Sequence, residues 1–223
     1  MLIPVMLTVL FAADTTYYVG FLKPDPARVK LEAPVSQRIQ SAHMAHIHAM
    51  ADAGQLVAAG PFEDKPQSIS GIFVFKTASI DEARKVANAD PTVTEHRNTM
   101  DVVTWHAPAG IGEEYVRLHK ADAKLAEGMG VHPLFLMQKG GNWDSPDRLA
   151  SLNAHSDYWA KWKAQLGVIG SVESLDGLTE IIIFKRIPYE DAQKLIADDP
   201  AVKAGILKPE GHHWWCAEHV LPL

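Results

Sequence analysis

The sequence has little cysteine and no excess of basic charge. Its one cysteine, Cys216, cannot form a disulfide within the chain. Because large secreted domains can do without disulfides, this count leaves the cellular compartment open. The formal net charge is -6, which provides no extended basic surface for the phosphate backbone of a nucleic acid. Nucleic acid is therefore excluded as an expected partner.

Sequence motifs that bind cofactors are also missing. The chain has no glycine-rich phosphate loop, no Gly-x-Ser-x-Gly elbow and no zinc-protease motif. The short run Gly110-Ile111-Gly112 falls short of a dinucleotide-binding fingerprint. We therefore expect no organic cofactor and no resident metal.

The most apolar stretch, residues 1–13 (MLIPVMLTVLFAA), is too short to span a bilayer. It ends in small residues and resembles the apolar part of a secretory signal cleaved near Ala12 or Ala13. No Lys or Arg precedes it, and Phe11 is bulky where a small residue is preferred. The sequence thus favours a secreted or periplasmic protein, and the alternative is a cytoplasmic one with an extra buried strand here. Neither interpretation leaves an integral membrane segment in the mature chain.

One stretch of the sequence occurs twice. Residues 71–93 read GIFVFKTASIDEARKVANADPTV, and residues 180–202 read EIIIFKRIPYEDAQKLIADDPAV. Each copy has a β-branched and aromatic run typical of a strand, then an acidic pair that opens a helix. Asp-Pro ends that helix, because the residue before proline is pushed out of the α region. The repeat predicts two copies of one small α/β module.

The segments around each copy complete a β-α-β-β-α-β order, which is the ferredoxin-like arrangement. We expect a first module over residues 14–109, a helical linker over 110–131 and a second, diverged module over 132–223. Helices on one side of a four-stranded sheet leave its other apolar face bare. Two fused modules can cover these faces by packing sheet on sheet or by closing a barrel. The expected fold class is therefore α+β.

The residues of the first module resemble the YCII-related family. The family pattern is a His on the first helix, a Gly and then Gly-Pro, a strand, a helix and Asp-Pro. Its counterparts here are His43, Gly54, Gly60-Pro61, residues 72–76 and Asp90-Pro91, followed by Trp105. The resemblance covers residues 17–108 well and residues 132–222 more weakly. It implies two tandem ferredoxin-like modules packed as a dimeric α/β barrel within one chain.

The resemblance also implies a catalytic dyad of His43 and Asp90. A neutral imidazole is a usable base near neutral pH, and a carboxylate on its other ring nitrogen would fix the tautomer. Without the resemblance, Asp90 would be an ordinary Asp-Pro turn residue and His43 a surface residue of a helix. The hypothesis is that His43 acts as general base and Asp90 orients it.

The second module departs from the family pattern. When the spacing between His43 and Gly60 is counted back from Gly170, the histidine position of the helix falls on Asn153, and His155 lies two residues away. Gly-Pro is replaced by Gly170-Ser171. His155 and Asp199 are therefore the candidates for a second site, and these departures weaken the prediction that this site works.

Three further residues are candidates for lining a pocket: His46, Trp105 and Trp214. His46 follows His43 by three residues on one helical face, a spacing that can bind zinc if a third ligand comes from elsewhere. No Cys or acidic residue stands at a suitable offset, so we expect no metal there. The two tryptophans are more often core residues than a ligand platform.

These features predict a small-molecule enzyme that needs no cofactor. The resemblance implies a lyase, isomerase or dehalogenating enzyme acting on ring compounds. The alternatives are a non-catalytic barrel that binds a small ligand and a structural protein whose pockets are filled by side chains. A concave pocket beside His43 and Asp90 would favour the first two. Pairing of two chains as a homodimer stays open.

Overall fold

The computed structural model describes residues 14–64, 68–174 and 176–222, so the signal-like segment 1–13 lies outside the described residues. The chain divides into two compact units. The first unit comprises residues 16–105, 110–131 and 213–222, and the second comprises residues 14–15, 106–109 and 132–212.

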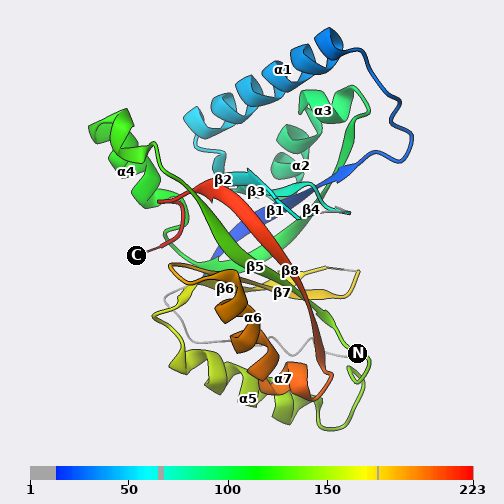
Figure 1. Ribbon diagram of the computed structural model, residues 1–223, viewed down its shortest axis with the longest axis vertical. Helices are drawn as coiled ribbons and strands as arrows, with labels where there is room; N and C mark the ends of the chain where they lie inside the picture. The colour runs from blue at the N-terminus through cyan, green and yellow to red at the C-terminus, as the bar shows by residue number, and fades with distance from the viewer. Residues whose placement is uncertain (1–13, 65–67, 175, 223) are drawn as a thin grey trace. The chain divides into compact units, whose positions relative to one another are not determined.

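The first unit has the predicted ferredoxin-like arrangement. Its elements are β1 (Asp14–Pro24), α1 (Ala33–Asp52), β2 (Leu56–Pro61), β3 (Gly71–Phe75), α2 (Ile80–Asn88), α3 (Pro91–Thr94) and β4 (Asn98–Pro108). The strands are ordered β2-β3-β1-β4, and β1 and β2 both run antiparallel to β3. Figure 1 shows α1, α2 and α3 on one face of these strands. Met50 of α1 and Ala83 of α2 pack there against Phe73 and Phe75.

Local sequence signals set the helix boundaries that position Asp90. The Ser79 side chain caps α2 by accepting a hydrogen bond from the Glu82 N–H at 3.2 Å. The Asp90-Pro91 pair ends this helical segment, as predicted, and Asp90 becomes the N-cap of α3. Its side chain accepts the Thr92 N–H at 2.8 Å, so one carboxylate oxygen is fixed by the cap.

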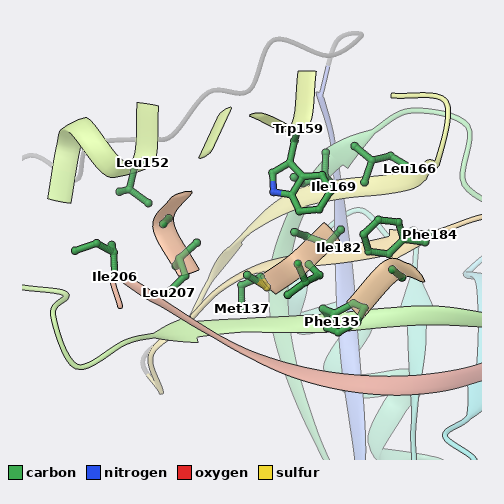
Figure 2. Packing of buried hydrophobic residues seen from close by; sticks show 13 residues of the cluster. Phe135, Met137, Leu152, Trp159, Leu166, Ile169, Ile182, Phe184, Ile206 and Leu207 are labelled. Carbon is green, nitrogen blue, oxygen red and sulfur yellow. The ribbon is translucent and has the colours of Figure 1, made fainter. Parts of the chain in front are cut away.

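The second unit repeats the same order of elements. They are β5 (Met129–Lys139), α5 (Arg148–Lys161), β6 (Leu166–Glu173), β7 (Leu178–Phe184), α6 (Tyr189–Asp198), α7 (Pro200–Lys203) and β8 (Leu207–Ala217). The strands are ordered β6-β7-β5-β8. Figure 2 shows the core, in which Trp159 of α5 lies over Ile182 and Phe184 of β7. The repeat detected in the sequence thus corresponds to strand β7, helix α6 and the Asp199 cap of α7.

The predicted linker forms α4 (Glu113–Ala121) and the short helix η1 (Ala123–Ala126), and it belongs to the first unit. The C-terminal residues from His213 onward belong there as well, whereas the sequence assigned them to the second module. Backbone hydrogen bonds explain this difference. Gly112 N–H donates to Val220 O at 2.7 Å, and Glu63 N–H donates to His213 O at 3.0 Å.

None of the helices in residues 14–64, 68–174 and 176–222 combines the length and the apolarity that a bilayer crossing requires.

Candidate functional site

The structure brings His43 and Asp90 together. Nδ1 of His43, on α1, lies 2.7 Å from Oδ2 of Asp90, at the start of α3. The pair is buried, with 8% of His43 and 0% of Asp90 exposed. The other carboxylate oxygen of Asp90, Oδ1, accepts the Thr92 N–H and the Thr92 hydroxyl, the latter at 2.6 Å. Asp90 is thus held from two sides, by a helix cap and by a histidine.

The hydrogen bonds to Asp90 determine its protonation state. Burial alone would raise the pKa of Asp90, but the hydrogen bonds from His43 and Thr92 outweigh it and hold the pKa below its ordinary value. An ionised carboxylate can only accept hydrogen bonds, so His43 must carry a proton on Nδ1. Within the described part of the chain, the other ring nitrogen, Nε2, has no hydrogen-bond partner. In a neutral His43, Nε2 therefore has a lone pair that can accept a proton.

His155 and Asp199 form the corresponding contact in the second module. Nδ1 of His155 lies 2.6 Å from Oδ2 of Asp199, which also accepts the indole N–H of Trp159 at 2.8 Å. Counting back from Gly170 in the sequence gives Asn153 as the residue equivalent to His43. That prediction was wrong, because His155 makes the contact. The segment from the histidine to the next strand runs from 155 to 166 here and from 43 to 56 in the first module, so it is two residues shorter.

The second module has an additional partner that the sequence reasoning missed. Oε2 of Glu180, on β7, lies 3.1 Å from Nε2 of His155. Both side chains are buried, with 0% of His155 and 4% of Glu180 exposed. His155 therefore lies between two carboxylates, and neither ring nitrogen is left for a ligand.

Strand register identifies the counterpart of Glu180 in the first module as Gly71. Glu180 pairs with Ser171 of β6, and Gly71 pairs with Pro61 of β2 at the same point of the sheet. A Cβ atom at Gly71 would lie 2.4 Å from the carbonyl oxygen of Gly60, so no side chain fits there. The difference was visible in the aligned repeat, but the sequence did not indicate that this position faces the histidine.

The two carboxylates change the protonation of His155. Burial alone would lower its pKa, but the charge of Glu180 and the hydrogen bond to Asp199 raise the pKa to about 10. His155 is therefore an imidazolium at neutral pH and cannot act as a base. The first module has an unoccupied basic nitrogen, and the second module has a histidine locked in its charged form.

The other predicted site residues do not join either histidine. Nε2 of His46 lies 2.9 Å from the carbonyl oxygen of Val86, so it links α1 to α2. Trp105 packs beside Tyr17, with ring centroids 6.1 Å apart. Trp214 donates its indole N–H to Gly60 O at 3.2 Å. Among the described residues, no group of three or more His, Cys, Asp or Glu side chains is arranged to hold a metal ion.

A cavity of about 220 Å³ lies beside the Asp90 end of the dyad. Ile39, one of its lining residues, precedes His43 by one turn of α1, and Thr92, another, donates its hydroxyl to Asp90. The remaining lining residues are Arg28, Ser36, Gln40, Arg97 and Asn98. The lining is therefore mostly polar and carries positive charge.

Comparison with known proteins places this site in a family. The sequence of residues 16–106 matches the model of the YCII-related domain. This stretch therefore carries a YCII-related domain. His43, Asp90 and the whole of the cavity lining lie within this YCII-related domain. No curated protein has a sequence that matches the chain.

Solved structures resemble the chain over nearly its whole length. A variant of chlorite dismutase from Candidatus Nitrospira defluvii has a TM-score of 0.59 at 10% identity, covering 93% of each chain. A heme-binding protein from Thermus thermophilus has a TM-score of 0.52 at 15% identity, covering 92% of this chain and 91% of that one. Identities this low show the fold alone. The predicted fold class, α+β with ferredoxin-like modules of the dimeric α/β-barrel type, is confirmed. The match to the YCII-related model covers the first module.

Proposed function

We propose that this protein is a small-molecule enzyme in which His43 acts as a general base and Asp90 orients it. The observation that carries the proposal is the state of the His43 ring. Its Nδ1 is held by an ionised Asp90, and its Nε2 is free of hydrogen-bond partners within the described part of the chain. Catalytic bases need this combination of a fixed tautomer and an accessible lone pair.

The chemistry that follows is proton transfer without a cofactor. Nε2 of His43 would take a proton from an acidic C–H bond of the substrate, and Asp90 would stabilise the imidazolium that forms. The electron pair of that C–H bond can form a double bond as a leaving group departs. Alternatively, the carbanion shifts its charge to another carbon, which takes up a proton. The first outcome is a lyase or dehalogenating reaction, and the second is an isomerisation. In both, His43 gives up its proton to complete the cycle.

We also infer that the second module is a diverged copy of the first whose site has closed. The shared order of elements and strands and the equivalent contact between His155 and Asp199 support common descent. Glu180 supports the loss of function, because it occupies the ring nitrogen that a substrate would need. The second module would then have no catalytic role of its own.

The residues around the two histidines do not fit a heme. A heme iron takes an imidazole nitrogen as axial ligand, and both nitrogens of His155 face carboxylates. The cavity near His43 has a volume of about 220 Å³ and six polar side chains among its seven lining residues. Pockets for large ligands are usually roughly 300–1,000 Å³ and predominantly apolar.

Base activity can be tested before a substrate is identified. The protein in D₂O is incubated with a panel of small ring compounds that carry C–H bonds next to a carbonyl group, and deuterium uptake is followed by mass spectrometry. We expect one or more compounds to exchange. The rate with the His43→Asn variant should be lower by a factor on the order of 10² or more.

The matched control is His48→Asn, which removes an exposed imidazole from the same helix, α1. It should exchange at the wild-type rate. Equal rates for wild type and His43→Asn would contradict the assignment of the base. If no compound exchanges faster than in buffer, the proposal fails in favour of the alternative, a barrel that binds a small ligand without chemistry.

A further inference from the structure

The cavity beside the dyad has the side chains of an anion-binding site. Two of its seven lining residues are arginines, Arg28 and Arg97, and four others carry hydroxyl or amide groups. Lining carboxylates are absent: no Asp or Glu is among the residues that form this cavity in the described part of the chain. In a protein with a net charge of -6, such a cavity is a local reversal of sign.

The two arginines are not neutralised by acidic neighbours. Arg97 donates one N–H to the carbonyl oxygen of Val29, which holds the guanidinium in place without cancelling its charge. Within the described residues, neither Arg28 nor Arg97 forms an ion pair. Other arginines in the chain do form ion pairs with carboxylates, at positions 38, 84, 117 and 148. A guanidinium presents several donors in a planar fork, which matches the oxygens of a carboxylate or phosphate.

The helix that carries His43 adds to the positive potential. Ser36 and Gln40, which line the cavity, lie in the first two turns of the 20-residue helix α1. The N-terminal end of a helix carries a partial positive charge that favours anions over its first turn, and Ser36 lies in that turn. Thr92 closes the other side, but its hydroxyl and N–H are already donated to Asp90. The donors left for a ligand are therefore those of the arginines, Ser36, Gln40 and Asn98.

We propose that this cavity binds a small anion through Arg28 and Arg97, and that the anion is a carboxylate or phosphate group. The size of the cavity, about 220 Å³, restricts the ligand to a small molecule or to one charged group of a larger one. Binding here does not depend on base catalysis by His43. It would, however, place a charged compound within one helical turn of the dyad, because Ile39 and His43 share a face of α1.

The test uses the full chain, with ¹³C-labelled methyl groups of Ile and Thr, and NMR titrations with inorganic phosphate, succinate and benzoate as probes. At least one probe should shift the methyl signals of Ile39 and Thr92 in a saturable way, and the methyl signal of Ile80, on α2, should stay in place. Phosphate and the two carboxylates are separate arms, so the arm that saturates identifies the chemical group.

Two variants and one control determine whether the arginines are responsible. Arg28→Gln and Arg97→Gln should each weaken binding about tenfold or more, since each removes a charge-assisted hydrogen bond. Arg84→Gln removes an exposed arginine of α2 and should leave the affinity unchanged. Because Arg97 also holds Val29, Arg97→Lys serves as a second variant that keeps the charge, and it should bind more tightly than Arg97→Gln.

Three results would overturn the proposal. The first is that none of the three probes saturates in the wild-type protein. The second is that Arg28→Gln and Arg97→Gln both bind as tightly as wild type. The third is that Arg84→Gln weakens binding as much as they do, because binding would then reflect net charge alone. None of these results bears on deuterium exchange by His43, so the two proposals can fail separately.

Discussion

Replacing His155 with Gln is expected to lower the free energy of unfolding by roughly 3–5 kcal/mol, the range for breaking a buried ion pair. His155 is completely buried between Asp199 and Glu180. Removing the imidazolium leaves two carboxylates facing each other without a cation, so one must take up a proton or the module must open. Thermal and urea unfolding of the variant and the wild type would measure the loss.

The equivalent change in the first module, His43→Gln, is the matched control. It should cost less, on the order of 1–2 kcal/mol, because Asp90 keeps two hydrogen bonds from Thr92 and, among the described residues, no second carboxylate forms an ion pair with His43. Equal losses from the two variants would contradict the view that only the second histidine is a locked ion.

The pH dependence of stability provides an independent check on His155. Its pKa is raised to about 10 in the folded protein, whereas the ordinary pKa of a histidine, expected in the unfolded chain, is 6.5. The stabilisation is therefore complete below about pH 6.5 and is lost as the pH rises towards about 10. Wild type should lose stability across this window, and His155→Gln should lack that loss.

Replacing Asp90 with Asn is expected to slow deuterium exchange by on the order of 10² to 10⁴-fold, although the two side chains have nearly the same shape. The reason lies in Thr92, which donates both its N–H and its hydroxyl to the same oxygen of Asp90. In the variant, the atom that accepts these two hydrogen bonds must still be an oxygen. The new amide NH₂ group would therefore face His43. Nδ1 would then have to accept a hydrogen bond, and the proton would move to Nε2.

With the proton on Nε2, neutral His43 has no lone pair directed at the substrate, and base catalysis stops. The control is Asp199→Asn, which makes the same change in the second module. It should destabilise the protein but leave the exchange rate of the folded protein unchanged. Exchange at the wild-type rate in Asp90→Asn would contradict the role given to Asp90.

Much of the fold could be predicted from the sequence because its signals are local. The repeat contained a strand, a helix and an Asp-Pro stop in each copy, and each Asp became the cap of a short helix. The family resemblance then identified His43 as the partner of Asp90, the first of these two caps. The C-terminal residues were assigned to the wrong unit, because hydrogen bonds such as that from Glu63 to His213 join segments far apart in the sequence.

The second site was harder to predict because it depends on register. The segment from the histidine to the next strand is two residues shorter in the second module, so counting back from Gly170 gives Asn153 instead of His155. No local pattern reports such a shift. The role of Glu180 was hidden for a related reason. A glutamate at the start of a strand usually lies at the surface, and only the pairing of β7 with its neighbours shows that this one faces His155.

One measurement tests the central claim that His43 can accept a proton on Nε2 and that His155 is held in its protonated form. It is a ring-nitrogen NMR titration of the wild-type protein, with the signals of His43 and His155 followed from about pH 5 to about pH 11. We predict that neutral His43 keeps its proton on Nδ1, next to Asp90, and that His155 stays protonated on both nitrogens until about pH 10. A neutral His43 with its proton on Nε2, or a His155 that titrates like a free imidazole, would contradict this account.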